Sequence, residues 1–102
     1  QHEDAYAMYS LGYCLLHGQG VERNSQSLRD GVRWLRKAAD LGEASAQYEL
    51  GCAYVRGQGV PCNQRLAMKW LRRASHAGHE AAISFMAGLQ PAGLPEENPD
   101  RA

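Results

Sequence analysis

The sequence has little of what strands, disulfide frameworks and membrane spans require. Ile83 is its single isoleucine and β-branched residues form no run, which disfavours β-strands. The three cysteines are an odd number with no close pairing, so a disulfide framework is not expected. No apolar run approaches the length of a membrane-spanning helix, and no signal peptide is visible. With 11 basic and 11 acidic residues among 102, the net charge favours no class of partner, and the length fits one domain.

What the chain does contain is an internal repeat. The segment Gly-Gln-Gly-Val at 18–21 returns at 57–60, and Trp-Leu followed by two basic residues and alanine at 34–38 returns at 70–74. The first pair is 39 positions apart and the second 36, so the first copy carries three extra residues within the polar stretch 22–27. Helical repeats tolerate insertions in loops, and we expect this one to lengthen a loop. A period of this length is typical of α-solenoids.

Each copy is predicted to form a pair of helices, the first of which ends in a left-handed cap at the first glycine of Gly-Gln-Gly-Val. The second helices are predicted to begin after the N-caps Ser27 and Asn63, and one more helix is predicted over 80–89. Gly12 and Gly51 are expected to admit a neighbouring helix, because a helix-interior glycine otherwise costs about 1 kcal/mol relative to alanine. Helical spacing predicts four buried stripes. They are Ala7, Leu11, Gly12 and Leu15; Ala46, Leu50, Gly51 and Tyr54; Gly31, Trp34, Leu35, Ala38 and Leu41; and Ala67, Trp70, Leu71, Ala74 and Ala77.

The repeated pattern resembles the Sel1-like repeat, a relative of the tetratricopeptide repeat. In that family Ala-x-Ala-x-Tyr-x-Leu-Gly is followed by Gly-x-Gly-Val and then by a Trp-Leu or Trp-Tyr segment that ends in glycine. Residues 5–42 and 44–78 keep these motifs in order. The departures are Leu15, where the family usually has tyrosine, Gly31, where it usually has alanine, and the three-residue insertion.

The resemblance implies an all-α fold, an α-solenoid of antiparallel helix pairs in a right-handed superhelix of about two and a half Sel1-like repeats. Repeat one would occupy 5–42, repeat two 44–78, and a capping half-repeat 79–90, so that the repeat domain spans 1–90. The segment 91–102 is rich in proline and acidic residues and is expected to be a disordered tail.

Members of this family act as adaptors in protein complexes, in bacterial envelope and signalling systems and in eukaryotic endoplasmic-reticulum quality control, and they are not generally catalysts. The resemblance therefore implies a non-enzymatic scaffold that binds a partner protein or peptide. The chain begins at Gln1 and is treated as a fragment or processed form, so the compartment stays open, with bacterial periplasm or cytoplasm favoured. A regulatory domain of a larger enzyme or secretion assembly is an alternative. An uncovered end of the stack would permit self-association.

The concave wall of tetratricopeptide-like superhelices is lined by the first helix of each pair, so the register of the two Leu-Gly pairs predicts which residues face a partner. Tyrosines suit peptide capture because each ring adds apolar area at low entropic cost and each hydroxyl can hydrogen-bond. Tyr9 and Tyr48 share one repeat position and also fit a packing role between helices, whereas Tyr6 and Tyr13 are not repeated and are better binding candidates. The predicted groove residues are Tyr6, Tyr9, Tyr13, His17, Ser45, Tyr48, Cys52, Val55 and Arg56.

Eight of the 11 basic residues lie on the second helices, where a convex face is expected. They permit binding of nucleic acid or of an acidic partner, which is a second alternative function. They also suit a solvated face, because basic side chains near a helix C-terminus favour the helix dipole and keep a solenoid soluble. We favour the solvated face. The residues are Arg29, Arg33, Arg36 and Lys37, followed 36 positions later by Arg65, Lys69, Arg72 and Arg73.

No metal, cofactor or catalytic site is predicted. His76 and His79 do not share the i, i+4 spacing that puts two ligands on one helix face, and Gly78 lies between them at a predicted helix end. Cys14 is expected to pack as a small apolar side chain. Cys62 lies in a loop without the adjacent histidine that nucleophilic catalysis requires. The glycine segments lack the Lys-Ser/Thr of phosphate-binding loops and are interpreted as turns.

Overall fold

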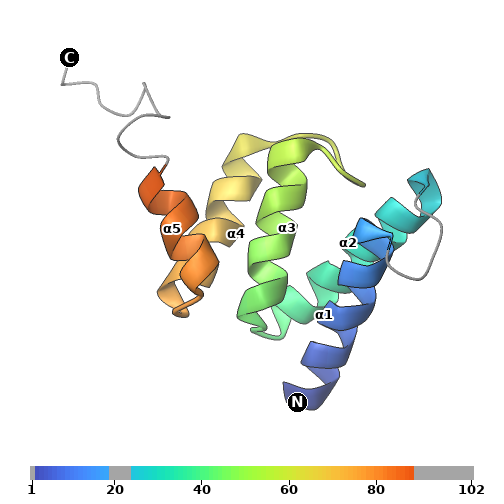
Figure 1. Ribbon diagram of the computed structural model, residues 1–102, viewed down its shortest axis with the longest axis horizontal. Helices are drawn as coiled ribbons and strands as arrows, with labels where there is room; N and C mark the ends of the chain where they lie inside the picture. Colours follow the sequence, from blue (N-terminus) through green and yellow to red (C-terminus); the bar gives the residue numbers. More distant parts are fainter. Residues whose placement is uncertain (1, 19–23, 89–102) are drawn as a thin grey trace.

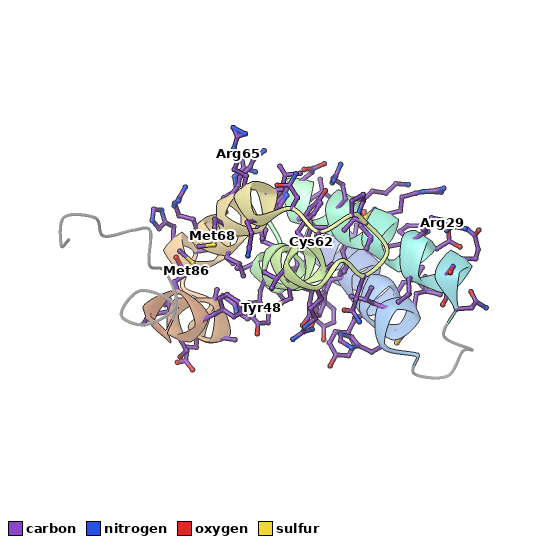
Figure 2. All side chains as sticks on the ribbon, turned by 90° about the horizontal axis from the view of Figure 1, so that it is seen from above. Arg29, Tyr48, Cys62, Arg65, Met68 and Met86 are labelled. Atoms are coloured by element: carbon purple, nitrogen blue, oxygen red, sulfur yellow. The ribbon has the colours of Figure 1, made fainter. Side chains whose placement is uncertain are left out.

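The computed structural model describes residues 2–18 and 24–88, which form five α-helices. Successive helices run antiparallel and occupy two layers, with α1, α3 and α5 in one and α2 and α4 in the other (Figures 1 and 2). None of the described residues lies in a strand. The all-α fold of paired helices predicted from the sequence is confirmed. The helices are α1 (His2–His17), α2 (Ser25–Asp40), α3 (Ala44–Arg56), α4 (Gln64–His76) and α5 (Glu80–Gly88).

Glycines at the helix crossings bring paired helices into direct contact. A Cβ atom on Gly12 would lie 2.8 Å from the backbone oxygen of Gly31, and one on Gly31 would lie 2.9 Å from the backbone oxygen of Gly12. The backbones of α1 and α2 therefore touch, which explains why both position 12 and position 31 are occupied by glycine. In the second pair, a Cβ on Gly51 would lie 2.6 Å from Cγ of Leu71. The close approach predicted at Gly12 and Gly51 is confirmed.

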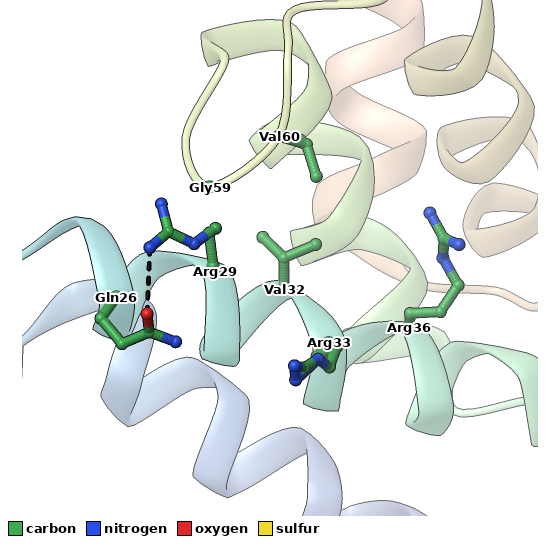
Figure 3. Close-up of a pocket in the computed structure, with 7 residues that line it drawn as sticks. All are labelled: Gln26, Arg29, Val32, Arg33, Arg36, Gly59 and Val60. Carbon is green, nitrogen blue, oxygen red and sulfur yellow. Dashed lines mark hydrogen bonds between the residues drawn. The ribbon is translucent and has the colours of Figure 1, made fainter.

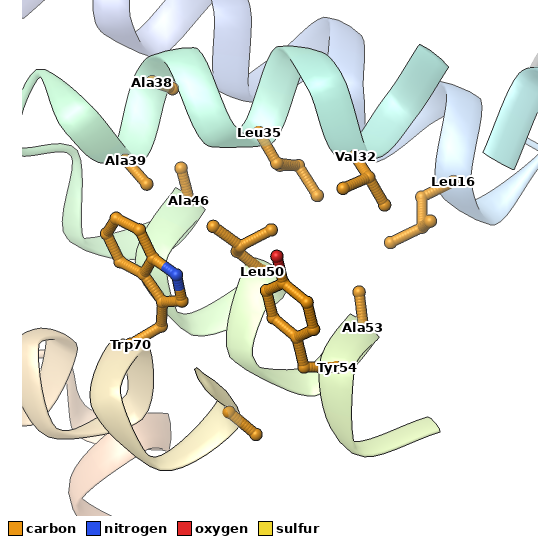
Figure 4. Packing of buried hydrophobic residues seen from close by; sticks show 11 residues of the cluster. Leu16, Val32, Leu35, Ala38, Ala39, Ala46, Leu50, Ala53, Tyr54 and Trp70 are labelled. Atoms are coloured by element: carbon orange, nitrogen blue, oxygen red, sulfur yellow. The ribbon is translucent and has the colours of Figure 1, made fainter. Parts of the chain in front are cut away.

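The core lies where α3 packs against α2 on one side and α4 on the other (Figure 4). Leu35, Ala46 and Leu50 are completely buried in it, and Trp70 of α4 is 4% exposed. Burying a leucine side chain contributes about 1.5–3 kcal/mol, so the packing of α3 against α2 and α4 contributes substantially to stability. The buried cluster comprises Leu16, Val32, Leu35, Ala38, Ala39, Ala46, Leu50, Ala53, Tyr54, Ala67 and Trp70.

Parts of the predicted buried stripes are exposed. Ala7 is exposed and Leu11 is 43% exposed, although their counterparts one repeat later are completely buried. The later residues are covered by α2, whereas no helix pair precedes α1 among the described residues. Leu41 and Ala77 occupy C-cap positions and are also exposed, and Trp34 is half-buried. The prediction of burial was wrong for these residues.

The three extra residues of the first repeat lengthen a helix, not a loop. α2 has 16 residues and α4 has 13, and both end at the same repeat position. Asn24 caps α2: its side chain accepts a hydrogen bond from the Ser27 N–H at 2.9 Å, and Ser27 Oγ accepts one from the Asn24 N–H at 2.9 Å. This capping box starts the helix almost one turn earlier than predicted. The predicted Ser27 cap was wrong, whereas Asn63 caps α4 as predicted. Of the predicted insertion, residues 22 and 23 lie outside the described residues.

The turn between α3 and α4 rests against α2. Gly57, the C-cap of α3, has a φ of 71°, as predicted for a left-handed cap, and Gly59 has a φ of 76°. A Cβ on Gly59 would lie 2.5 Å from the backbone oxygen of Leu28, so only glycine lets this turn approach α2 so closely. The predicted tail, 91–102, and the end of the predicted half-repeat lie outside the described residues.

Candidate functional site

Four aromatic side chains form a row along α1. Tyr6, Tyr9, Tyr13 and His17 follow one another at three- or four-residue steps, which place them on one side of the helix. The ring centroids are 5.7 Å apart for Tyr6 and Tyr9, 5.9 Å for Tyr9 and Tyr13, and 4.3 Å for Tyr13 and His17. Tyr6 is 58% exposed and the other three are half-buried. We call these four residues the aromatic row.

Glu49 of α3 links the aromatic row to the second repeat. His17 Nε2 lies 3.2 Å from Glu49 Oε1, so an imidazole N–H can donate to the carboxylate. Burial raises the pKa of Tyr9, and the negative charge of Glu49 raises it further. The Tyr9 phenol therefore remains protonated at neutral pH and can donate a hydrogen bond. Glu49 was not predicted as a site residue, because its contact crosses from one repeat to the next.

Tyr48 extends the aromatic surface from α3 toward α5. Its ring stacks on the imidazole of His79, with centroids 4.9 Å apart and planes inclined by 20°. His79 Nδ1 accepts a hydrogen bond from the Ala82 backbone N–H at 3.3 Å, which holds the imidazole at the start of α5. Burial raises the pKa of Tyr48 as well. His79 was missed as a site residue because the sequence shows no pairing between positions 48 and 79. We define the aromatic face as the aromatic row together with Tyr48 and His79.

The remaining predicted groove residues differ in their accessibility. Cys52 is a correction, because it is only 3% exposed and is not available to a partner. Burial raises the pKa of its thiol, so Cys52 acts as a small apolar side chain. Val55 is half-buried and packs against the core. Ser45 is half-buried near the start of α3, and Arg56 is exposed at its end.

The basic residues of α2 and α4 lie on the opposite side of the molecule. In Figure 2, Arg29 and Arg65 are on one side and Tyr48 is on the other. All eight basic side chains on these helices are exposed. Lys37 Nζ lies 4.8 Å from the centroid of the Trp34 ring. At the corresponding positions of α4, the guanidinium carbon of Arg73 lies 4.9 Å from the centroid of the Trp70 ring. These cation–π contacts give part of the basic face a packing role.

The chemistry of the aromatic face is that of a binding surface. It offers ring faces, phenol hydroxyls and imidazole nitrogens, which contact apolar side chains and peptide groups. Within residues 2–18 and 24–88, no group of three or more His, Cys, Asp or Glu residues is arranged to hold a metal ion. No helix in the same ranges is long and apolar enough to cross a membrane.

Comparison with known proteins identifies the repeat. The Sel1 repeat family matches residues 5–43 and 44–79. The crystal structure of a Sel1 repeat protein from Oxalobacter formigenes is similar with a TM-score of 0.77 and 36% identity, over 84% of this chain and 34% of that one. An F-box protein of Arabidopsis thaliana is 36% identical over 86 residues, which cover 84% of this chain and 22% of that protein. Chitin synthase regulator SKT5 of Saccharomyces cerevisiae is 32% identical over 82 residues, or 79% of this chain and 12% of that protein.

These similarities concern a repeat domain and not whole proteins. The chain spans only 22% and 12% of the length of the two sequence relatives. Those relatives are from a plant and a yeast, whereas the solved structure is from Oxalobacter formigenes, so the comparisons do not show the bacterial setting expected from the sequence. Sel1 repeats are in general non-catalytic modules for protein–protein interaction. With two matched repeats and the fold of a solved family member, the chain belongs to the Sel1 repeat family.

Proposed function

We propose that this chain is a scaffold or adaptor module that binds a segment of a partner protein across its aromatic face, and that it acts by binding, without catalysis. The observation that carries the proposal is the aromatic row, in which four successive rings lie 4.3–5.9 Å apart along one accessible side of α1. Rings that already pack against one another lose little further freedom when a partner covers them. The general role of Sel1 repeats in protein–protein interaction supports this function.

The hydrogen-bonding state of the face suggests the chemistry of the bound segment. Tyrosine phenols are protonated at neutral pH, and the raised pKa values of Tyr9 and Tyr48 keep both hydroxyls as donors to higher pH. A bound segment would place backbone carbonyl oxygens near these hydroxyls and apolar side chains on the rings between them. Tyr6 and Tyr13 remain the stronger candidates because they are not repeated, whereas Tyr9 also packs against the core and Tyr48 stacks on His79 of the next helix.

Peptide selection tests this proposal with random sequences in place of a natural partner. Twelve-residue random peptides displayed on phage are selected against the chain, and the enriched peptides are measured by fluorescence anisotropy. We expect Tyr13→Ala to weaken binding about tenfold, because truncating an interface tyrosine typically costs 1 kcal/mol or more. Arg72→Ala, on the opposite side, is the control and should change the affinity less than twofold. Circular dichroism verifies that both variants are folded.

Two results would contradict the proposal. One is that no peptide is enriched, and the other is that Tyr6→Ala and Tyr13→Ala leave every enriched peptide bound as before. Binding to duplex DNA that weakens steeply with salt, and that is abolished by Arg36→Glu and Arg72→Glu, would support the nucleic-acid alternative instead.

A second candidate is a regulatory module within a larger protein or assembly. It is favoured by the similarity to chitin synthase regulator SKT5. The matched region makes up 12% of the length of that protein. In this role the same face would bind an enzyme and change its activity. The test is whether a partner enzyme, once isolated, changes its rate when the chain is added and no longer does so with Tyr13→Ala.

A further inference from the structure

A groove separates α2 from the turn that joins α3 to α4, on the side opposite the aromatic face. It consists of two adjoining hollows of about 300 and 340 Å³ that share Arg29, Gly59 and Val60. Figure 3 shows the residues that line the first of them. Ser25 and Gln26 each line one hollow, and both belong to the extra turn of α2. The groove is thus partly built by the three-residue insertion, which the second repeat lacks.

Three arginines line one hollow of this groove. Arg29, Arg33 and Arg36 follow at i, i+4 and i+7, so they span about 10 Å along the helix axis. Among the described residues, Asp30 is the one carboxylate within 4.0 Å of any of them, and it lies 4.0 Å from Arg33. One carboxylate near three guanidinium groups leaves the groove with a local excess of positive charge, although the whole chain is neutral. The ion pair itself contributes little, because it is long and lies at the surface.

Uncharged groups hold the two outer arginines. Arg29 donates a hydrogen bond to Gln26 Oε1 at 3.0 Å, and Arg36 donates to the hydroxyl of Tyr54. Tyr54 is itself only 5% exposed, so its hydroxyl is a fixed anchor for the Arg36 guanidinium. Both guanidinium groups are therefore positioned without being neutralised, and each keeps N–H groups for a further acceptor.

The bottom of the groove is apolar. Val32 is 5% exposed and Val60 is half-buried, and Figure 3 shows the two valines between Arg29 and Arg36. Gly59 keeps the turn close to α2, because any larger residue would meet the backbone of that helix. The combination is an apolar strip with a guanidinium at each end.

We propose that this groove binds an acidic, extended segment of a partner protein. One apolar side chain would lie on Val32 and Val60, and carboxylates on either side would pair with Arg29 and Arg36. In an extended chain, alternate side chains point the same way, and residues i and i+4 are about 13 Å apart. Arg29 and Arg36 are about 10 Å apart along the helix axis, and their side chains point away from each other, so their guanidinium groups suit two acidic residues at this spacing. The segment would read acidic-x-apolar-x-acidic. The planar guanidinium suits carboxylates because it can donate two parallel hydrogen bonds.

The apolar strip favours a peptide over nucleic acid. A phosphate backbone carries no apolar side chain to cover two valines, and it would engage the arginines of α2 and α4 alike. The proposal concerns a different surface from the aromatic face and does not depend on it, so either site can fail alone.

The test uses the whole chain and a fluorescein-labelled peptide containing Glu-Ser-Leu-Ser-Glu, with binding followed by fluorescence anisotropy. Reversing charge in the groove by Arg29→Glu with Arg36→Glu should weaken binding at least tenfold. Arg65→Glu with Arg72→Glu is the matched control, since these residues lie 36 positions later, where the hollow beside Arg65 is lined by Asn63, Leu66 and Lys69 of the same helix and its cap. This control should change the affinity less than twofold. Arg29→Glu alone should weaken binding several-fold, and it leaves the Tyr54 contact in place.

Changes in the peptide complete the test. Replacing both glutamates with glutamine should abolish measurable binding, and replacing leucine with serine should weaken it several-fold. Failure of the acidic peptide to bind at millimolar concentration would overturn the proposal. Equal losses from the groove pair and the control pair would also overturn it, because they would indicate a diffuse basic surface. Tighter binding of a labelled DNA duplex than of the peptide, lost with both pairs, would assign that surface to nucleic acid.

Discussion

Replacing Gly12 with alanine should have two opposite effects on stability, because it improves helix propensity and worsens packing. Propensity alone predicts a gain of about 1 kcal/mol in the free energy of unfolding, because glycine is the poorer helix former. Packing predicts a loss, since the new Cβ would lie 2.8 Å from the backbone oxygen of Gly31 and 2.9 Å from Cγ of Leu35. Overpacking costs about 1–3 kcal/mol. We expect a cost in the upper half of this range, because the Gly31 oxygen belongs to the backbone and Leu35 is completely buried, so neither can move away easily. The expected net loss is about 1–2 kcal/mol.

Thermal unfolding followed by far-ultraviolet circular dichroism measures this loss. For a chain of this size, 1–2 kcal/mol corresponds to a fall of about 5–15 °C in Tm. Ser10→Ala is the control on the same helix, because it adds no atom toward α2, and it should change stability by less than about 0.5 kcal/mol. A rise in Tm for Gly12→Ala, as propensity alone predicts, would refute the backbone contact between α1 and α2.

Three further predictions concern stability. Leu50→Ala should cost about 3–5 kcal/mol in urea unfolding, because Leu50 is completely buried in the core, and a cost below about 1 kcal/mol would contradict that packing. Asn24→Ala should cost about 0.5–2 kcal/mol, similar to Asn63→Ala, whereas no cost would mean that α2 does not begin at this cap. The free energy of unfolding should fall as pH rises above about 9, because the raised pKa values of the Cys52 thiol and of the Tyr9 and Tyr48 phenols make their ionisation less favourable in the folded state. Tyr9→Phe should reduce this fall, and an unchanged pH profile would contradict the stated cause.

Internal repetition made much of the fold predictable. A residue such as Leu50 that keeps its type and register in both copies has to meet a shared structural need, and its burial followed from helical spacing. Gly12 and Gly51 were predictable because glycine in a helix interior is unfavourable unless another helix lies close. The positive φ of Gly57 likewise followed from its place at a helix end.

Features that depend on neighbours outside the repeat were not predictable. Leu11 has the same register as Leu50, but among the described residues no helix precedes α1 to cover it as α2 covers Leu50. Ser27 is a suitable N-cap by residue type, but Asn24 forms a reciprocal capping box with it and lengthens α2. Residue type alone does not choose between two suitable caps, and the groove lined by the extra turn could not be expected without that choice.

The candidate site was predicted in part. The aromatic row follows from helical spacing, because Tyr6, Tyr9, Tyr13 and His17 lie on one helix. The contacts of Glu49 and His79 join different helices, and helical spacing within one helix does not reveal them.

The measurement that tests the central claim most directly is photo-crosslinking of a selected peptide to the chain. The photoreactive residue p-benzoylphenylalanine replaces Tyr6, which is 58% exposed at one end of the aromatic row, or Arg72 on the opposite side. Mass spectrometry then locates the attached peptide. Binding across the aromatic face predicts strong crosslinking from position 6 that an excess of unlabelled peptide abolishes, and only background crosslinking from position 72. Crosslinking from position 72 without crosslinking from position 6 would contradict it.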